Sequence, residues 1–139
     1  MRSPTERGAG ELMAGLAAKG HGPLTIDSVM GGRLKLIQPE KGYRVGMDAV
    51  LLAAAVPAKE GETALDAGAA SGVAALCLAA RVPGVQVTAI EIQPSLVEIG
   101  RANIALNGQA RNVTLVQGDR KSTRLNSSHL KLSRMPSSA

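Results

Sequence analysis

Four residues near the middle of the chain have the types and spacing of a binding site for a nucleotide-like ligand. Asp66 ends a short apolar segment, Gly68 and Gly72 lie in the small-residue turn that follows, and Glu91 comes 23 residues after Gly68. Glycine lets the backbone bend sharply and lie against a ligand. A carboxylate at this distance can accept hydrogen bonds from both hydroxyls of a ribose.

A strand–turn–helix–strand unit would bring these residues together. Residues 62–67 are typical of a buried parallel strand, residues 73–81 of a helix that Pro83-Gly84 ends, and residues 85–90 of a second strand. The carboxyl ends of the strands meet at one edge of the sheet, where the free N–H groups of the helix suit an anionic group. The sequence therefore predicts an α/β fold with its site at that edge.

Two ligand classes share this geometry, and the turn distinguishes them. The dinucleotide fingerprint G-x-G-x-x-G would place glycines at Gly68, Ala70 and Val73, and only the first of these is glycine. The pattern D-x-G-x-G-x-G fits better, because only its middle glycine is replaced, by Ala70. This second pattern resembles the S-adenosylmethionine (SAM) loop of class I methyltransferases.

Shorter elements precede and follow this unit. Residues 24–38 predict two strands joined by a Gly-Gly turn. Asp48 begins a short helix, either as its N-cap or as a first-turn acid. A further helix, Pro94 to about Leu106, leads to a third strand at residues 113–117. Residues 1–22 predict a loosely ordered N-terminal extension.

Three segments together are similar to the bacterial tRNA1(Val) (adenine-N6)-methyltransferase family: GGRLKLIQPEKGYRVGMDAVLLAAAVPA, LDAGAASG and AIEIQPSLVEIGRANIALNG. The resemblance implies a partial class I methyltransferase (Rossmann-like) three-layer sandwich over residues 23–118, with parallel strands one to three only. It also implies SAM as cofactor and tRNA as substrate. The residues expected at the cofactor are Asp66, Gly68, Ala70, Gly72, Glu91, Asp119 and Asp48.

The resemblance also defines what this chain lacks. Members of the family use an Asn-Pro-Pro-Tyr motif after the fourth strand to orient the adenine amine and stack on the base. The chain contains no Asn-Pro-Pro, and Tyr43 is its only aromatic residue. We therefore expect no catalytic residue and no activity from this chain. A protein-glutamine or small-molecule N-methyltransferase, and a nicotinamide-dependent oxidoreductase, are the alternatives.

Residues 119–139 predict a non-native, disordered tail. The run DRKSTRLNSSH, which begins at Asp119, can be back-translated into a sequence that resembles a common short-read sequencing adapter. Residues 120–139 carry five basic residues and no acid, so they account for the whole net charge of +5. The charge therefore does not indicate a nucleic-acid-binding domain.

With strands one to three only, the outer edge of the first strand would be unpaired and prone to aggregation.

The cysteine count and the length of the apolar runs limit which partners and which cellular location we expect. Cys77 is the only cysteine, so it has no disulfide partner within the chain, and its apolar helix predicts a buried core position. No Cys/His spacing suggests a metal, and the apolar runs are too short to cross a membrane. We expect a cytoplasmic protein without metal or membrane partners, and the sequence carries no signal for its oligomeric state.

Overall fold

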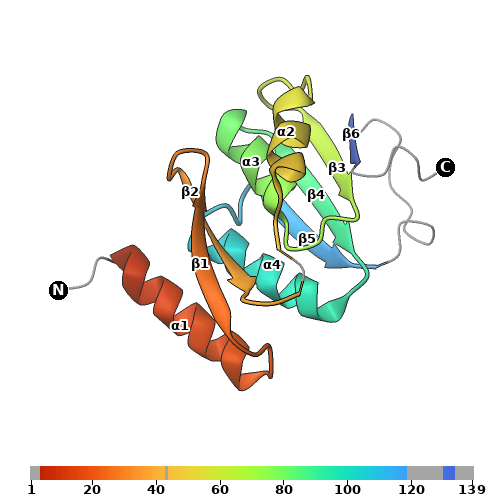
Figure 1. Ribbon diagram of the computed structural model, residues 1–139. Coiled ribbons are helices and arrows are strands. Elements are labelled where there is room, and N and C mark those ends of the chain that lie inside the picture. The colour runs from red at the N-terminus through yellow and green to blue at the C-terminus, as the bar shows by residue number, and fades with distance from the viewer. Residues whose placement is uncertain (1–3, 43, 119–129, 134–139) are drawn as a thin grey trace.

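The computed structural model describes residues 4–42, 44–118 and 130–133 (Figure 1). The helices are α1 (Pro4–Ala18), α2 (Met47–Ala55), α3 (Val73–Arg81) and α4 (Pro94–Leu106). The strands are β1 (Leu24–Val29), β2 (Leu34–Pro39), β3 (Thr63–Ala67), β4 (Gln86–Glu91), β5 (Val113–Gln117) and β6 (Leu130–Ser133). β1 and β2 form an antiparallel hairpin, and the other strands form a parallel sheet in the order β5-β4-β3-β6. The predicted α/β class is confirmed.

Register in the parallel sheet brings the predicted site to one edge. Ala67, the last residue of β3, lies opposite Ile90 of β4, and Glu91 lies opposite Gln117 at the end of β5. The turn that follows β3 therefore begins beside Glu91, at the carboxyl ends of three neighbouring strands. This is the edge where open α/β sheets bind their ligands.

Helix α3 forms the centre of the core. Seven of its nine residues are buried, because the helix lies between the sheet, the β1–β2 hairpin and α2. Leu76 and Leu78 are completely buried. Cys77 is 2% exposed, which confirms the predicted core position, and burial raises the pKa of its thiol to about 11.

Helices α3 and α4 pack on one face of the parallel sheet, and α1 lies against α4 and the hairpin (Figure 1). Right-handed crossovers from β3 to β4 and from β4 to β5 place α3 and α4 on the same side. The sheet residues that join the core there are Ala64, Val87, Ala89, Val113 and Leu115. Leu65, Thr88 and Val116, which point to the opposite face, are half-buried or exposed. Two of the three layers of the expected sandwich are thus present.

The parallel sheet has one strand more than the sequence predicted. β6 pairs in parallel with β3, from Ala64 opposite Leu130 to Ala67 opposite Ser133. The prediction that residues 119–139 are disordered throughout is therefore wrong for residues 130–133, and the rest of that segment lies outside the described residues. An unpaired strand edge presents N–H and C=O groups that another extended segment can satisfy, which explains the pairing physically.

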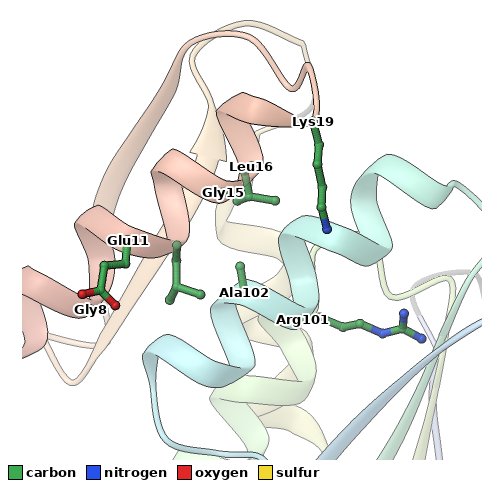
Figure 2. A pocket seen from close by; sticks show the side chains of 8 residues that line it. Gly8, Glu11, Gly15, Leu16, Lys19, Arg101 and Ala102 are labelled. Atoms are coloured by element: carbon green, nitrogen blue, oxygen red, sulfur yellow. The ribbon is translucent and has the colours of Figure 1, made fainter.

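The expectation of a loose N-terminal extension is also wrong. α1 is a helix of fifteen residues that packs along α4 (Figures 1 and 2). Ala9, Leu12, Met13 and Leu16 recur at the spacing of one helix face, and the last three pack against α4 or the hairpin. Three glycines within α1 lower its intrinsic helix propensity, so tertiary packing decides its structure.

Candidate functional site

The turn between β3 and α3 wraps around the end of β4. The backbone N–H groups of Gly68 and Ala69 both donate to the carbonyl of Ile90, at 2.9 Å each. Gly68 and Gly72 have φ angles of 82° and 83°, in the left-handed region that favours glycine. A Cβ atom at either glycine would meet nothing within 4 Å, so open space lies against the backbone there. The turn thus has the form of a cradle.

Glu91 closes this cradle from the neighbouring strand. Its Oε1 accepts a hydrogen bond from the backbone N–H of Ala70 at 2.8 Å, and its Oε2 accepts one from the N–H of Gln93 at 2.9 Å. The residue is 7% exposed. An ionised carboxylate has about four lone-pair sites, so about two remain for a ligand such as a ribose diol. Glu91 therefore lies where the sequence placed it and also fixes the turn.

The other predicted cofactor residues differ in their placement. Asp66 is completely buried within β3, opposite Ala89 of β4 and Leu132 of β6. Asp48 is exposed in the first turn of α2, with its carboxylate folded back toward Gly46. Asp119 and Tyr43 lie outside the described residues. Contacts of these residues with a cofactor stay predictions.

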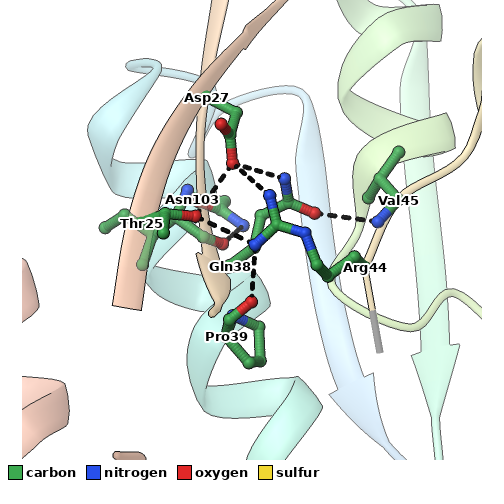
Figure 3. Close-up of polar contacts among 8 residues, drawn as sticks. Thr25, Asp27, Gln38, Pro39, Arg44, Val45 and Asn103 are labelled. Carbon is green, nitrogen blue, oxygen red and sulfur yellow. Dashed lines mark hydrogen bonds and ion pairs between the residues drawn. The ribbon is translucent and has the colours of Figure 1, made fainter. Parts of the chain in front are cut away.

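Sequence reasoning missed a polar cluster that braces the segment leading into α2 (Figure 3). Arg44 donates to Asp27 Oδ2 at 3.0 Å and to the carbonyl of Pro39 at 2.7 Å. Gln38 donates to the same Asp27 oxygen at 2.7 Å and accepts from the N–H of Val45 at 2.8 Å. The alternation of polar residues along the first strand was the only signal in the sequence, and it does not identify partners.

Two carboxylates with lowered pKa values, one in this cluster and one on α4, make the stability of the fold depend on pH. Hydrogen bonds from Gln38 and then Thr25, with the charge of Arg44 beside them, lower the pKa of Asp27. A hydrogen bond from His21 is the largest cause of the lowered pKa of Glu98 on α4. A carboxylate with a lowered folded-state pKa stabilises the fold above its unfolded pKa, and that contribution is lost as the pH falls through the folded value.

We therefore expect the free energy of unfolding to fall as the pH drops below about 4, the usual range for these carboxyls. Asp27→Asn should lower stability at pH 7 and make the decline in acid shallower. Urea unfolding from pH 3 to pH 7 measures both effects. Glu40→Gln, at an exposed acid outside the cluster, is the control. An acid limb of equal steepness in Asp27→Asn would contradict the assignment.

The middle position of the turn, Ala70, allows a test of backbone strain. Ala70 has a φ of 52°, which is strained for a residue with a Cβ atom, and it is 5% exposed. Ala70→Gly should raise the free energy of unfolding by about 1 kcal/mol, as relief of strain outweighs the added freedom of the unfolded chain. Ala69→Gly is the matched control, because Ala69 is equally buried but has no positive φ. Chemical denaturation should show stabilisation for the first variant and destabilisation for the second; the reverse order would refute the strain.

Comparison with known proteins places the site in a family. A family model described as a methyltransferase domain matches residues 64–135, which include the turn and Glu91. The chain belongs to this methyltransferase-domain family. It is 36% identical over 77 residues to the tRNA1(Val) (adenine(37)-N6)-methyltransferase of Yersinia pestis (strain Pestoides F). That alignment covers 55% of this chain and 31% of the relative, so the chain spans under a third of the curated enzyme it matches.

Three solved structures share the fold of this domain. P. horikoshii TYW2, solved in complex with MeSAdo, superposes with a TM-score of 0.65 at 21% identity, over 76% of this chain and 40% of that one. M. jannaschii TYW2, solved in complex with AdoMet, gives 0.64 at 22% identity, over 76% and 48%. Trm5b from Pyrococcus abyssi gives 0.62 at 25% identity, over 73% and 30%.

In the described part of the chain, no three His, Cys, Asp or Glu residues gather in a group that could hold a metal ion. His21 instead contacts Glu98 across the α1–α4 corner, at 3.1 Å. None of the helices in residues 4–42 and 44–118 has the length and apolar character needed to span a bilayer.

Proposed function

We propose that this chain is the cofactor-binding part of a SAM-dependent tRNA adenine-N6 methyltransferase. SAM is the cofactor of this methyltransferase domain. The observation that carries the proposal is the convergence of Glu91 on the turn after β3, with one carboxylate oxygen 2.8 Å from the Ala70 amide nitrogen. The tRNA substrate is supported by the name of the Yersinia relative and by the family resemblance.

The residues of the site fit the adenosyl half of this cofactor. SAM supplies an electrophilic methyl group on a sulfonium. Glu91 would accept hydrogen bonds from the two ribose hydroxyls, using the lone pairs that the turn leaves unused. Gly68 and Gly72 leave open space for the ligand against the backbone, and the amino end of α3 would face its carboxylate.

Substrate orientation would need groups that this sequence does not contain. Without an Asn-Pro-Pro-aromatic motif, nothing in the sequence matches the family's device for holding the adenine amine in line with the methyl group. We therefore propose that the chain binds SAM and does not turn it over.

Calorimetry on the purified chain tests the binding. Titration with S-adenosylhomocysteine should give saturable binding at one site, and titration with NAD should give none. Saturable NAD binding without a response to S-adenosylhomocysteine would favour the oxidoreductase alternative. A methyl-transfer assay with unmodified tRNA tests the second part, and turnover by this chain would contradict the expected inactivity.

A further inference from the structure

Asn103, near the carboxyl end of α4, joins two parts of the molecule that are distant in sequence. It is completely buried. Its Oδ1 accepts from the backbone N–H of Ile37 at 2.7 Å, and its Nδ2 donates to the Ile37 carbonyl at 3.1 Å (Figure 3 shows its place beside the hairpin). The same Nδ2 reaches the carbonyl of Ser71 in the turn at 3.5 Å, the outer limit of a hydrogen bond.

A second observation ties the same face of α4 to the turn. A Cβ atom on Gly100, one helical turn before Asn103, would lie 3.2 Å from the carbonyl carbon and oxygen of Ser71 and 2.4 Å from Cδ2 of Leu115. The backbone of α4 thus lies close against Ser71, where a Cβ atom would make an unusually tight contact. Ser71 is itself 2% exposed. The turn is therefore held against α4 by close backbone packing as well as by the amide of Asn103.

Asn107 makes the same kind of contact with the hairpin backbone as Asn103 does. Four residues after Asn103, its Oδ1 accepts from the N–H of Lys35 at 2.9 Å and its Nδ2 donates to the Lys35 carbonyl at 2.8 Å. Both asparagines thus pair with alternate residues on the outer edge of β2, as a further strand would. The Nδ2 of Asn107 also donates to the carbonyl of Asn103 within α4, whereas the Nδ2 of Asn103 reaches the turn.

We propose that Asn103 is a positioning residue for the cofactor turn, and that it couples the β1–β2 hairpin to SAM binding. This inference rests on the proposed function. Asn103 acts through Ser71, which directly precedes Gly72, the residue whose left-handed backbone begins α3. Docking of the hairpin orients the amide of Asn103, and that amide holds the carbonyl of Ser71 in the place that shapes the cradle.

Two alanine variants separate an effect on ligand affinity from an effect on the stability of the fold alone. Asn103→Ala and Asn107→Ala each remove a bidentate contact to β2, and only the first removes the contact to Ser71. Isothermal titration with S-adenosylhomocysteine should show affinity weakened by about tenfold in Asn103→Ala, because a displaced turn would cost about one hydrogen bond between the turn and the ligand. Asn107→Ala should stay within about twofold of the unsubstituted chain by the same reasoning. Thermal melting without ligand should show both variants destabilised.

Gly100→Ala is the independent variant, because its methyl group would press on the Ser71 carbonyl and on Cδ2 of Leu115, neither of which belongs to the hairpin. It should also weaken binding of S-adenosylhomocysteine, and it serves as the test if Asn103→Ala does not fold. Unchanged affinity in the folded variants, or equal losses in Asn103→Ala and Asn107→Ala, would overturn the positioning role and leave the cofactor site intact. No binding by the unsubstituted chain would instead overturn the proposed function, and the positioning role with it.

Discussion

Replacing Glu91 with alanine is expected to weaken the binding of S-adenosylhomocysteine by about a hundredfold. Two hydrogen bonds from a ribose to a charged carboxylate would be lost, and about 3 kcal/mol corresponds to that factor. The substitution should also lower the free energy of unfolding by about 1 to 3 kcal/mol, because the buried N–H of Ala70 loses its acceptor. The N–H of Gln93 adds less, since Gln93 is exposed and water can replace the carboxylate.

Two further variants separate the loss of ligand affinity from the loss of stability. Glu91→Gln keeps the size of the side chain and one acceptor oxygen, so it should recover part of the stability while binding stays weak. Glu62→Gln is the matched control, because Glu62 also accepts a backbone N–H, from Lys59 at 3.1 Å, but lies at the opposite end of β3. Calorimetric titration and chemical denaturation give the two quantities. A folded Glu91→Ala chain that binds within about twofold of the unsubstituted one would exclude Glu91 from the cofactor site.

The sequence was informative wherever the site is built from neighbouring residues. Gly68, Gly72 and Glu91 belong to one strand–turn–helix–strand unit, and the fixed pairing of parallel strands makes their spacing a reliable guide to their position. The hairpin predicted at residues 24–38, which the structure has over 24–39, and the helix of Asp48 rested on the similarly local signals of turn glycines and capping.

Long-range contacts could not be predicted in this way. Asn103 and Ile37 are 66 residues apart, and a polar residue in an apolar helix does not name its partner. Asp66 was expected beside the cofactor because it ends the apolar run, and that role stays a prediction. Its complete burial, with β3 paired to strands on both sides, was not foreseen. Likewise, α1 depends on the apolar face of α4, which its own glycine-containing sequence does not reveal.

Removal of residues 119–139 is expected to make the chain self-associate more strongly than the full-length chain does. The shortened chain loses β6, so residues 64–67 of β3 present unpaired N–H and C=O groups at the edge of the sheet. The adjoining sheet face carries Leu65 and Val116, the second of which is 38% exposed. Light scattering after gel filtration should show a mass that rises with protein concentration.

Charge must be separated from strand pairing in this experiment, because the deleted segment carries the excess of basic residues and a nearly neutral protein associates more readily. A full-length chain with residues 130–133 replaced by alternating glycine and serine keeps most of that charge and lacks a strand-forming segment. Equal association of both altered chains would assign the effect to the β3 edge. A monomeric replacement chain beside an associating deletion would assign it to charge, and two monomers would refute the prediction. If the edge is responsible, residues 130–133 of the tail that was predicted to be non-native can form a strand beside β3 because the open edge of β3 accepts an extended partner of any origin.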